Sequence, residues 1–262
     1  QFTTRPADQK PSITGQWDFD QGDLSATIGQ PLQYLDGANG ASAAQSQFGT
    51  TTSFGIPNIR GVPAKVLRFG GAINRQVGYL MTHEALPNGG DTAVKVNQWT
   101  LIVDLLIPNS AGQGWFSFGQ FDSLDNSSDG ELFANFSGGT GGLGISGSYP
   151  KDPPIVAGRW HRVVFAVDAA GAISKYVDGA KQADQTSWSG QGFDGRHALL
   201  PSAILFADED GESQPAFINS IQFRNYKLSD EAVAALGGPA AEGIPAVSGQ
   251  WDVESGDLHA TL

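Results

Sequence analysis

Residues 158–168, GRWHRVVFAVD, contain a run of apolar residues that follows polar ones, and this pattern predicts a strand in which alternate side chains face opposite sides. Val163, Phe165 and Val167 then point to one side of the strand, and the side chains between them point to the other. A turn of small residues leads to a second run at residues 173–179, which ends on Asp-Gly. The two runs predict an antiparallel hairpin.

Short apolar runs separated by turns rich in glycine and proline continue along most of the chain. We expect further strands at residues 12–20, 65–69, 78–82, 99–108, 115–121, 131–136, 204–207 and 217–226. Residues 36–61 are polar and glycine-rich, so we expect long loops there. A helix is predicted at residues 229–237, where Ser229 is a typical N-cap and Gly237 stands just past the end. This pattern predicts an all-β fold, a two-sheet antiparallel β-sandwich of the jelly-roll type with one short C-terminal helix.

The composition fits one large β domain and disfavours several classes of partner. The chain has 262 residues with 35 glycines, 14 prolines, no cysteine and a net charge of −12. That charge disfavours nucleic acids, whose phosphates require a basic surface, and it disfavours anionic membranes. No apolar stretch reaches the roughly 18 residues that a membrane-spanning helix needs. An acidic, lysine-poor, cysteine-free chain is compatible with an exported protein, either secreted, periplasmic or held at the cell surface.

The two ends of the chain share a repeated sequence. Residues 15–18, 22–24 and 26–27 recur at residues 249–252, 256–258 and 260–261, all at a constant offset of 234. This period is too long for a solenoid and indicates duplication of a whole domain. We therefore divide the chain into residues 1–11, a leader or linker; residues 12–237, the sandwich; residues 238–246, a linker; and residues 247–262. The last segment is either the start of a duplicated second domain or a tail paired with the first.

The order of these motifs resembles a known family. The strings GRWHRVVFAVDAAGAISKYVDG, ILFADEDGE and FINSIQFRNYKLSDEAVAALGG, together with GQWDFDQGDLSATIG and NQWTLIVDLLIP, are similar to laminin-G-like and pentraxin-like domains of the concanavalin A-like lectin and glucanase superfamily. The resemblance spans roughly residues 12 to 240. It implies a concanavalin A-like sandwich that binds glycans or a cell-surface protein through its loops.

Two acidic loops form the predicted metal site. Residues 129–131, DGE, open one expected strand, and residues 208–212, DEDGE, follow another. Calcium takes about six to eight oxygen ligands in tolerant geometry, and carboxylate-rich loops suit it. The alternative is that both loops are solvated turns. The resemblance to pentraxins implies that the loops converge on calcium, although Gly130 replaces an amide ligand of that family. The expected ligands are Asp129, Glu131, Asp208, Glu209, Asp210 and Glu212.

Aromatic residues suggest where a sugar could stack. Trp188 lies in the polar context QTSWSG and is the tryptophan expected to be exposed, so we predict that it binds ligand. Four other tryptophans lie in strand patterns and are expected in the core: Trp17, Trp99, Trp115 and Trp160.

The sequence favours binding over catalysis. A retaining glycosidase of this architecture is expected to carry Glu-x-Asp-x-x-Glu along one strand, and no such string occurs. Asp104, an isolated acid within an apolar strand, is expected to make a hydrogen bond on the strand face. We therefore expect a non-catalytic binding module within a longer chain, with a calcium site in its loops. Two alternatives stay open: a glycoside hydrolase or polysaccharide lyase on the same fold, and a structural or adhesin repeat without a small ligand.

Overall fold

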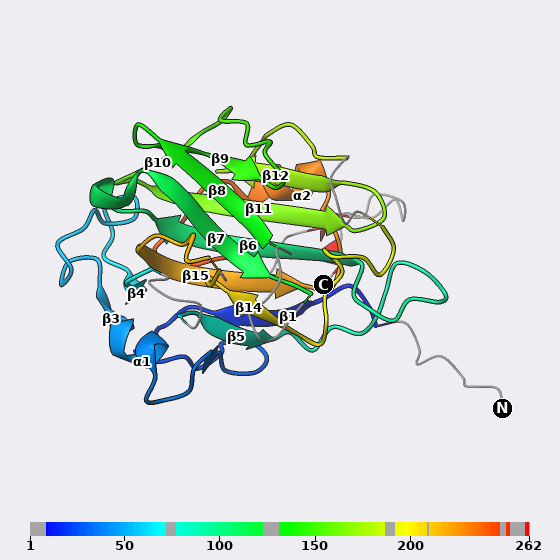
Figure 1. The fold of residues 1–262 in the computed structure, drawn as a ribbon, viewed down its shortest axis with the longest axis horizontal. Coiled ribbons are helices and arrows are strands. Elements are labelled where there is room, and N and C mark those ends of the chain that lie inside the picture. The colour runs from blue at the N-terminus through cyan, green and yellow to red at the C-terminus, as the bar shows by residue number, and fades with distance from the viewer. Residues whose placement is uncertain are drawn as a thin grey trace.

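The computed structural model describes residues 9–71, 77–122, 131–186, 192–208, 210–246, 250–251 and 260–261. Within these residues, two antiparallel sheets are stacked face to face, which confirms the predicted β-sandwich (Figure 1). The first sheet contains β1 (Ile13–Trp17), β3 (Gln47–Thr50), β4 (Lys65–Phe69), β6 (Gln98–Leu106), β11 (Trp160–Asp168), β12 (Ile173–Val177), β13 (Ala180–Lys181) and β15 (Ala216–Arg224). The second contains β2 (Gln33–Tyr34), β5 (Tyr79–Thr82), β7 (Gly114–Gln120), β8 (Glu131–Ser137), β9 (Thr140–Gly144), β10 (Ile155–Val156) and β14 (Ser202–Leu205).

The strand order brings distant parts of the chain together. The first sheet runs β13-β12-β11-β6-β15-β4-β3, with β1 also paired to β15, and the second runs β10-β9-β8-β7-β14-β5-β2. The longest pairings are those of β6 with β11 and with β15, at the centre of the first sheet. The helices of the described part are α1 (Ala41–Gln45), the 3-10 turn η1 (Asn109–Ala111) and α2 (Asp230–Leu236), and none of them is long and apolar enough to cross a membrane.

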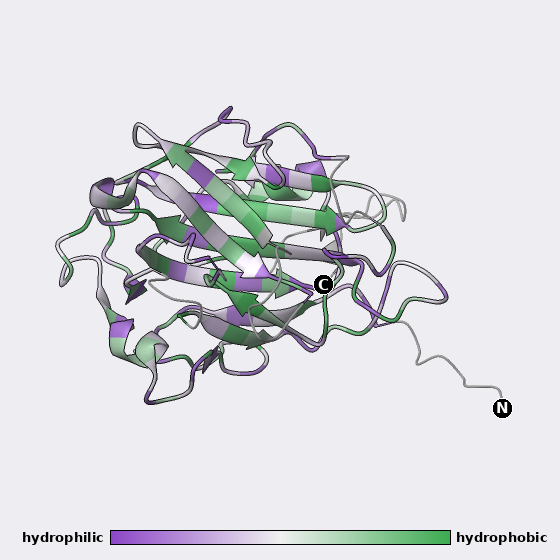
Figure 2. Cartoon of the chain, viewed as in Figure 1, coloured by the Kyte–Doolittle hydropathy of each residue, from purple (hydrophilic) through white to green (hydrophobic). Residues whose placement is uncertain are grey.

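The main core lies between the two sheets, where hydropathy is highest along the facing strands (Figure 2). Val163, Phe165 and Val167 of β11 belong to this core, as their alternation predicts. The intervening Val164 and Ala166 lie on the outer face of the first sheet, in a second apolar cluster that α2 covers. Both faces of β11 are therefore buried, one against the second sheet and one beneath the helix.

Helix α2 begins and ends where the sequence predicts. The Ser229 Oγ accepts a hydrogen bond from the Ala232 N–H at 3.2 Å, and Gly237 takes a left-handed φ of 56° just beyond the helix. Val233 is buried against the outer face of the first sheet.

The loop predicted for residues 36–61 contains two regular elements, α1 and β3. The five-residue helix α1 has no N-cap side chain of its own. Instead, the Asp36 carboxylate accepts hydrogen bonds from the Ala41 and Ser42 N–H groups at 2.5 and 3.2 Å. This cap comes from five residues upstream, so it does not follow the local spacing by which a helix start is recognised in a sequence.

Asp104 of β6 forms a buried ion pair with Arg162 of β11. The Arg162 Nε and Nη2 donate to the two Asp104 carboxylate oxygens at 2.7 Å each, and both side chains are at most 1 % exposed. Arg162 Nη1 also donates to the Leu236 carbonyl at the end of α2, and Nη2 donates to the Gly243 carbonyl. Asp104 is thus a hydrogen-bonding residue on the strand face, as expected, and the pair joins the sheet to the segment after α2.

Ile244 and Pro245, within the segment 238–246 that was predicted as a linker, contact the sandwich. Ile244 is 2 % exposed and lies in the cluster beneath α2. Its carbonyl accepts a hydrogen bond from Gln16 Nε2 at 3.0 Å, and the Pro245 carbonyl accepts one from Gln222 Nε2 at 3.1 Å.

The described parts of the repeated segments make comparable contacts. β16 (Gln250–Trp251) and β17 (Ala260–Thr261) pair with each other in a separate two-stranded sheet. In the first copy, Gln16 forms an isolated antiparallel bridge with Ile28, the residue after the Ala26-Thr27 pair.

Candidate functional site

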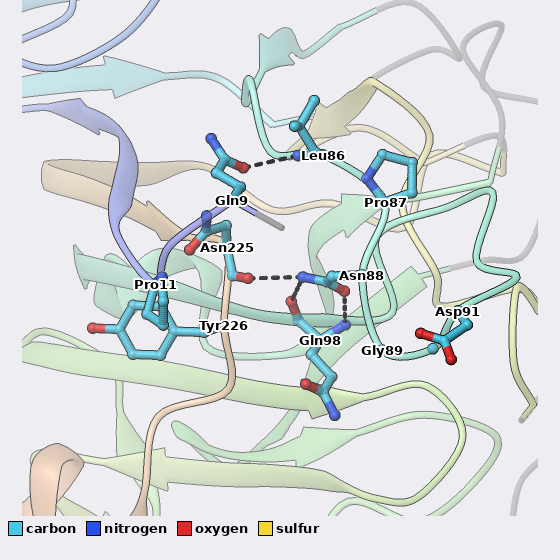
Figure 3. A pocket seen from close by; sticks show the side chains of 11 residues that line it. Gln9, Pro11, Leu86, Pro87, Asn88, Gly89, Asp91, Gln98, Asn225 and Tyr226 are labelled. Atoms are coloured by element: carbon cyan, nitrogen blue, oxygen red, sulfur yellow. Dashed lines mark hydrogen bonds between the residues drawn. The ribbon is translucent and has the colours of Figure 1, made fainter. Parts of the chain in front are cut away.

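A pocket of about 330 Å³ opens where four segments of the chain meet (Figure 3). These segments are residues 9–11, the loop of residues 86–91, the start of β6, and residues 225–226 after β15. Its polar lining residues are Gln9, Asn88, Asp91, Gln98, Asn225 and Tyr226. Most of these residues are amides, and none of the lining residues is a lysine, arginine or histidine.

Asn88 holds the pocket together. Its Nδ2 donates to the carbonyls of Gln98 and Asn225 at 2.8 Å each, and its Oδ1 accepts from the Gln98 N–H at 2.7 Å (Figure 3). The Oδ1 also accepts from the Asn97 N–H at 2.8 Å. These four hydrogen bonds use both donors and both lone pairs of the amide. Asn88 is therefore a positioning residue that fixes the loop against the start of β6 and the end of β15.

The segment before β1 forms one wall of the pocket. Gln9 accepts a hydrogen bond from the Leu86 N–H at 2.9 Å and donates one to the Glu84 carbonyl at 3.3 Å. The Asn225 side chain accepts from the Ser12 N–H at 2.7 Å and donates to the Lys10 carbonyl at 3.0 Å. Residues 9–12, of which residues 9–11 were predicted as part of a leader or linker, are thereby tied to the rest of the pocket.

Three lining side chains are the candidates to contact a ligand. The Gln98 amide is half-buried and makes no hydrogen bond within the described part of the chain. The Tyr226 ring is half-buried, and its hydroxyl accepts a hydrogen bond from Arg224 Nη1 at 3.0 Å while retaining its own proton for donation. Asp91 is exposed at the opposite side of the opening in Figure 3. The pocket thus combines a free amide, a hydroxyl on an aromatic ring, and one carboxylate.

Of the predicted metal ligands, the three whose side chains the structure describes, Asp208, Asp210 and Glu212, do not line this pocket. Asp208 is 2 % exposed, and its Oδ2 accepts hydrogen bonds from the Asp210 and Glu212 N–H groups at 2.8 and 2.6 Å. This carboxylate therefore holds the turn closed, while the side chains of Asp210 and Glu212 are exposed. Within the described residues, no group of three or more His, Cys, Asp or Glu side chains is arranged to hold a metal ion.

Several predicted site residues fall outside the described part of the chain. They are Asp129, Glu209, Trp188 and the side chain of Glu131. The convergence of the two acidic loops and the stacking role of Trp188 therefore stay predictions.

The four tryptophans that were expected in the core all lie within the described residues. Trp17, Trp99 and Trp160 are buried as expected, whereas Trp115 is only half-buried. Trp115 packs against Phe133 and Tyr149, with ring centroids 5.6 and 4.8 Å away.

The sequence did not single out the pocket residues. Asn88 lies in the string PNGG, which reads as a turn, and Tyr226 ends a strand pattern. A concentration of amides at strand ends was the available signal. It did not identify a site because Asn is also common in ordinary turns.

Comparison with solved structures identifies similar folds. Domain 4 of an extracellular GH43 arabinanase from Geobacillus stearothermophilus, solved in complex with arabinotriose, has a TM-score of 0.52 and 18% identity; the match covers 86% of this chain and 98% of that domain. The binding domain of botulinum neurotoxin serotype D has a TM-score of 0.52 and 12% identity, and that of serotype G has 0.52 and 9%. Those two matches cover 85% and 86% of this chain and about half of each toxin domain. At these identities the likeness shows the fold alone. No protein-family model and no curated protein sequence matches the chain.

Proposed function

We propose that this chain is a non-catalytic module that binds neutral glycans outside the cytoplasm, through the pocket at residues 86–91 and Tyr226. The observation that carries the proposal is the pocket lining, which combines four amides, one carboxylate and the aromatic ring and hydroxyl of Tyr226, with no cationic side chain among the lining residues. Sugars offer hydroxyl groups that both donate and accept hydrogen bonds, and C–H faces that pack on aromatic rings. The cavity of about 330 Å³ lies within the range of small-ligand sites, roughly 300–1,000 Å³.

The charge distribution favours a neutral ligand. The chain carries a net charge of −12, and the charged side chain that lines the pocket is Asp91. An anionic sugar, such as a uronate or a sulfated unit, would meet repulsion and find no lysine or arginine to pair with. Uncharged hexoses and pentoses avoid both problems.

Binding without catalysis is supported by the number of acids in the pocket. Glycoside hydrolysis generally requires two carboxyl groups roughly 5–10 Å apart. Among the described lining residues, Asp91 is the one carboxylate. The similar solved structures include a domain bound to arabinotriose and two toxin binding domains, which supports a binding role and makes arabino-oligosaccharides the first ligands to test.

Gln98→Ala is expected to lower the affinity for the glycan about tenfold, or about 1.4 kcal/mol, because it removes the amide that is free to bond hydroxyl groups. A neutral-glycan array that includes arabinotriose selects the ligand, and calorimetry then compares the variants. Gln21→Ala removes an exposed amide that does not line the pocket, so it is the matched control and should bind as the wild type does. If the wild type retains no glycan, the proposal fails; if Gln98→Ala binds as well as Gln21→Ala, the site lies elsewhere.

Calcium at the acidic loop of residues 208–212 is part of the proposal, supported by its carboxylate-rich sequence and the resemblance stated above. A metal that binds only the native state stabilises it, so saturating calcium should raise the Tm by roughly 5–10 °C over chelator. Asp210→Asn removes an exposed carboxylate but keeps the Asp210 N–H that bonds to Asp208. The variant should therefore melt as the wild type does in chelator and lose most of the calcium shift. Equal melting of the wild type with calcium and with chelator contradicts the calcium site.

A further inference from the structure

Exposed apolar side chains gather beside the pocket. Among the described residues, the large hydrophobic side chains that are clearly exposed are Val62 at 48 %, Leu86 at 42 %, Val94 at 74 % and Phe193 at 39 %. Leu86 lines the pocket, Val94 follows in the same loop, and Phe193 packs on that loop. Single exposed hydrophobic residues are common, but three on or against the segment that lines one cavity indicate a contact surface.

Phe193 lies directly on a residue that lines the pocket. A Cβ atom placed on Gly90 would come within 2.7 Å of Cε2 and 2.8 Å of Cζ of the Phe193 ring. Glycine at position 90 therefore permits the ring to approach the loop backbone closely. The ring therefore lies directly beside a residue that lines the pocket.

The backbone beside Phe193 is held in place by a network around Asp194. The Asp194 carboxylate accepts hydrogen bonds from the N–H groups of Val94 and Lys95, at 3.1 and 2.9 Å, and from Asn97 Nδ2 at 2.9 Å. The Asp194 N–H in turn donates to Asn97 Oδ1 at 2.6 Å, and Asp194 adopts a left-handed φ of 53°. These four hydrogen bonds fix the backbone of residues 94–95 and the Asn97 side chain around Asp194, the residue next to the ring. Phe193 is presented to solvent by a well-bonded loop, which limits the entropy that it would lose on binding a ligand.

We propose that Phe193 is a second sugar-stacking platform, so that the ligand is a linear neutral polysaccharide bound along its chain. One sugar unit occupies the pocket at Gln98 and Tyr226, the chain crosses Gly90, and a further unit stacks on the Phe193 ring. This inference rests on the proposed glycan-binding function and adds the class of ligand. A pocket alone could hold a single terminal sugar, whereas a platform outside the pocket selects internal segments of a chain.

The test is a length series of arabinan oligosaccharides from arabinose to arabinohexaose, together with the neutral-glycan array, titrated into wild type, Phe193→Ala, Phe193→Leu and Phe193→Trp. The wild type should gain affinity as the oligosaccharide lengthens. Phe193→Ala should remove about tenfold of the affinity for the longest ligand and leave that for the shortest unchanged. Phe193→Leu keeps the apolar character but not the flat ring and should behave like the alanine variant, whereas Phe193→Trp should retain the gain. Val62→Ala, at an exposed apolar residue that does not line the pocket, is the control for loss of surface hydrophobicity.

The outcomes separate the two levels of the proposal. The platform is overturned, and the glycan-binding function stands, if the wild type binds a glycan and either Phe193→Ala or Phe193→Leu binds oligosaccharides of every length as tightly as the wild type does. If no glycan binds to the wild type, both are overturned. Because Phe193 is exposed, all variants are expected to melt with the wild type, which separates a binding defect from misfolding.

Discussion

Arg162→Met is expected to destabilise the domain by about 3–5 kcal/mol. The substitution leaves the fully buried Asp104 carboxylate without its ion-pair partner, and it removes the donor to the carbonyls of Leu236 and Gly243. Breaking a buried pair on one side costs more than removing both members, because the remaining charge has neither water nor a partner. Urea denaturation measures the loss as a lower midpoint.

The double variant Asp104→Leu, Arg162→Met is the matched control. It removes both charges, so it should be more stable than Arg162→Met alone even though it carries an additional substitution. A double variant that is no more stable than Arg162→Met would show that the unpaired charge is not the origin of the effect.

The pH dependence of Arg162→Met gives an independent check on the ion pair. Burial raises the pKa of Asp104 to about 6 in the wild type, while the hydrogen bond and positive charge of Arg162 oppose that rise. Without Arg162 the pKa rises further, so the native variant keeps a proton that the wild type releases above about pH 6. A raised acid pKa favours the native state at low pH and less so as the pH rises. The deficit of the variant relative to the wild type should therefore grow as the pH rises above about 6.

Trp99→Ala should also cost about 3–5 kcal/mol. Trp99 lies in the central strand β6, is fully buried, and packs against Phe121 and Phe223 with ring centroids 4.8 and 6.1 Å away. Its Nε1 donates to the His197 carbonyl at 3.0 Å, so the variant also leaves a buried acceptor without that donor. The free energy of unfolding in urea is the measurement.

Trp115→Ala provides the comparison for Trp99→Ala. Trp115 is the same residue type in a strand, but it is half-buried and rests on Phe133 and Tyr149. Part of the Trp115 side chain is already in contact with water in the native state. Trp115→Ala should therefore lower the free energy of unfolding by less than half as much as Trp99→Ala does. Equal losses for the two variants would show that exposure does not decide the cost here.

Most strands of the sandwich could be predicted from the sequence because runs of apolar residues directly reflect burial. In β11 one set of alternate side chains packs between the sheets and the other beneath α2, so residues 163–167 are all apolar and the strand is predicted correctly. Helix α2 was recognisable for a similar reason, since Ser229 and Gly237 act within the residues adjacent to the helix. By contrast, α1 depends on Asp36, which lies outside the local signals that predict helix ends.

The candidate site could not be predicted because its residues come from four segments. Asn88 becomes a positioning residue only when its loop meets the start of β6 and the end of β15, and Asn225 only when residues 10–12 reach it. In the sequence, each of these amides resembles a turn residue. The acidic loops were conspicuous in the sequence for the opposite reason, because carboxylates adjacent in the chain form a visible motif. Asp208 shows that a carboxylate of such a motif also stabilises the turn, because it accepts hydrogen bonds from the N–H groups of Asp210 and Glu212.

The wall built by Gln9 has a practical consequence for truncated forms of the protein. The first strand starts at Ile13, so a fragment trimmed to the regular secondary structure would keep the whole sandwich core. It would nevertheless lack the residue that bonds to Leu86 and Glu84, and one side of the cavity would stand open. A fragment of this kind would fold and still lack a complete pocket, so a fragment meant for binding experiments should start upstream of Gln9.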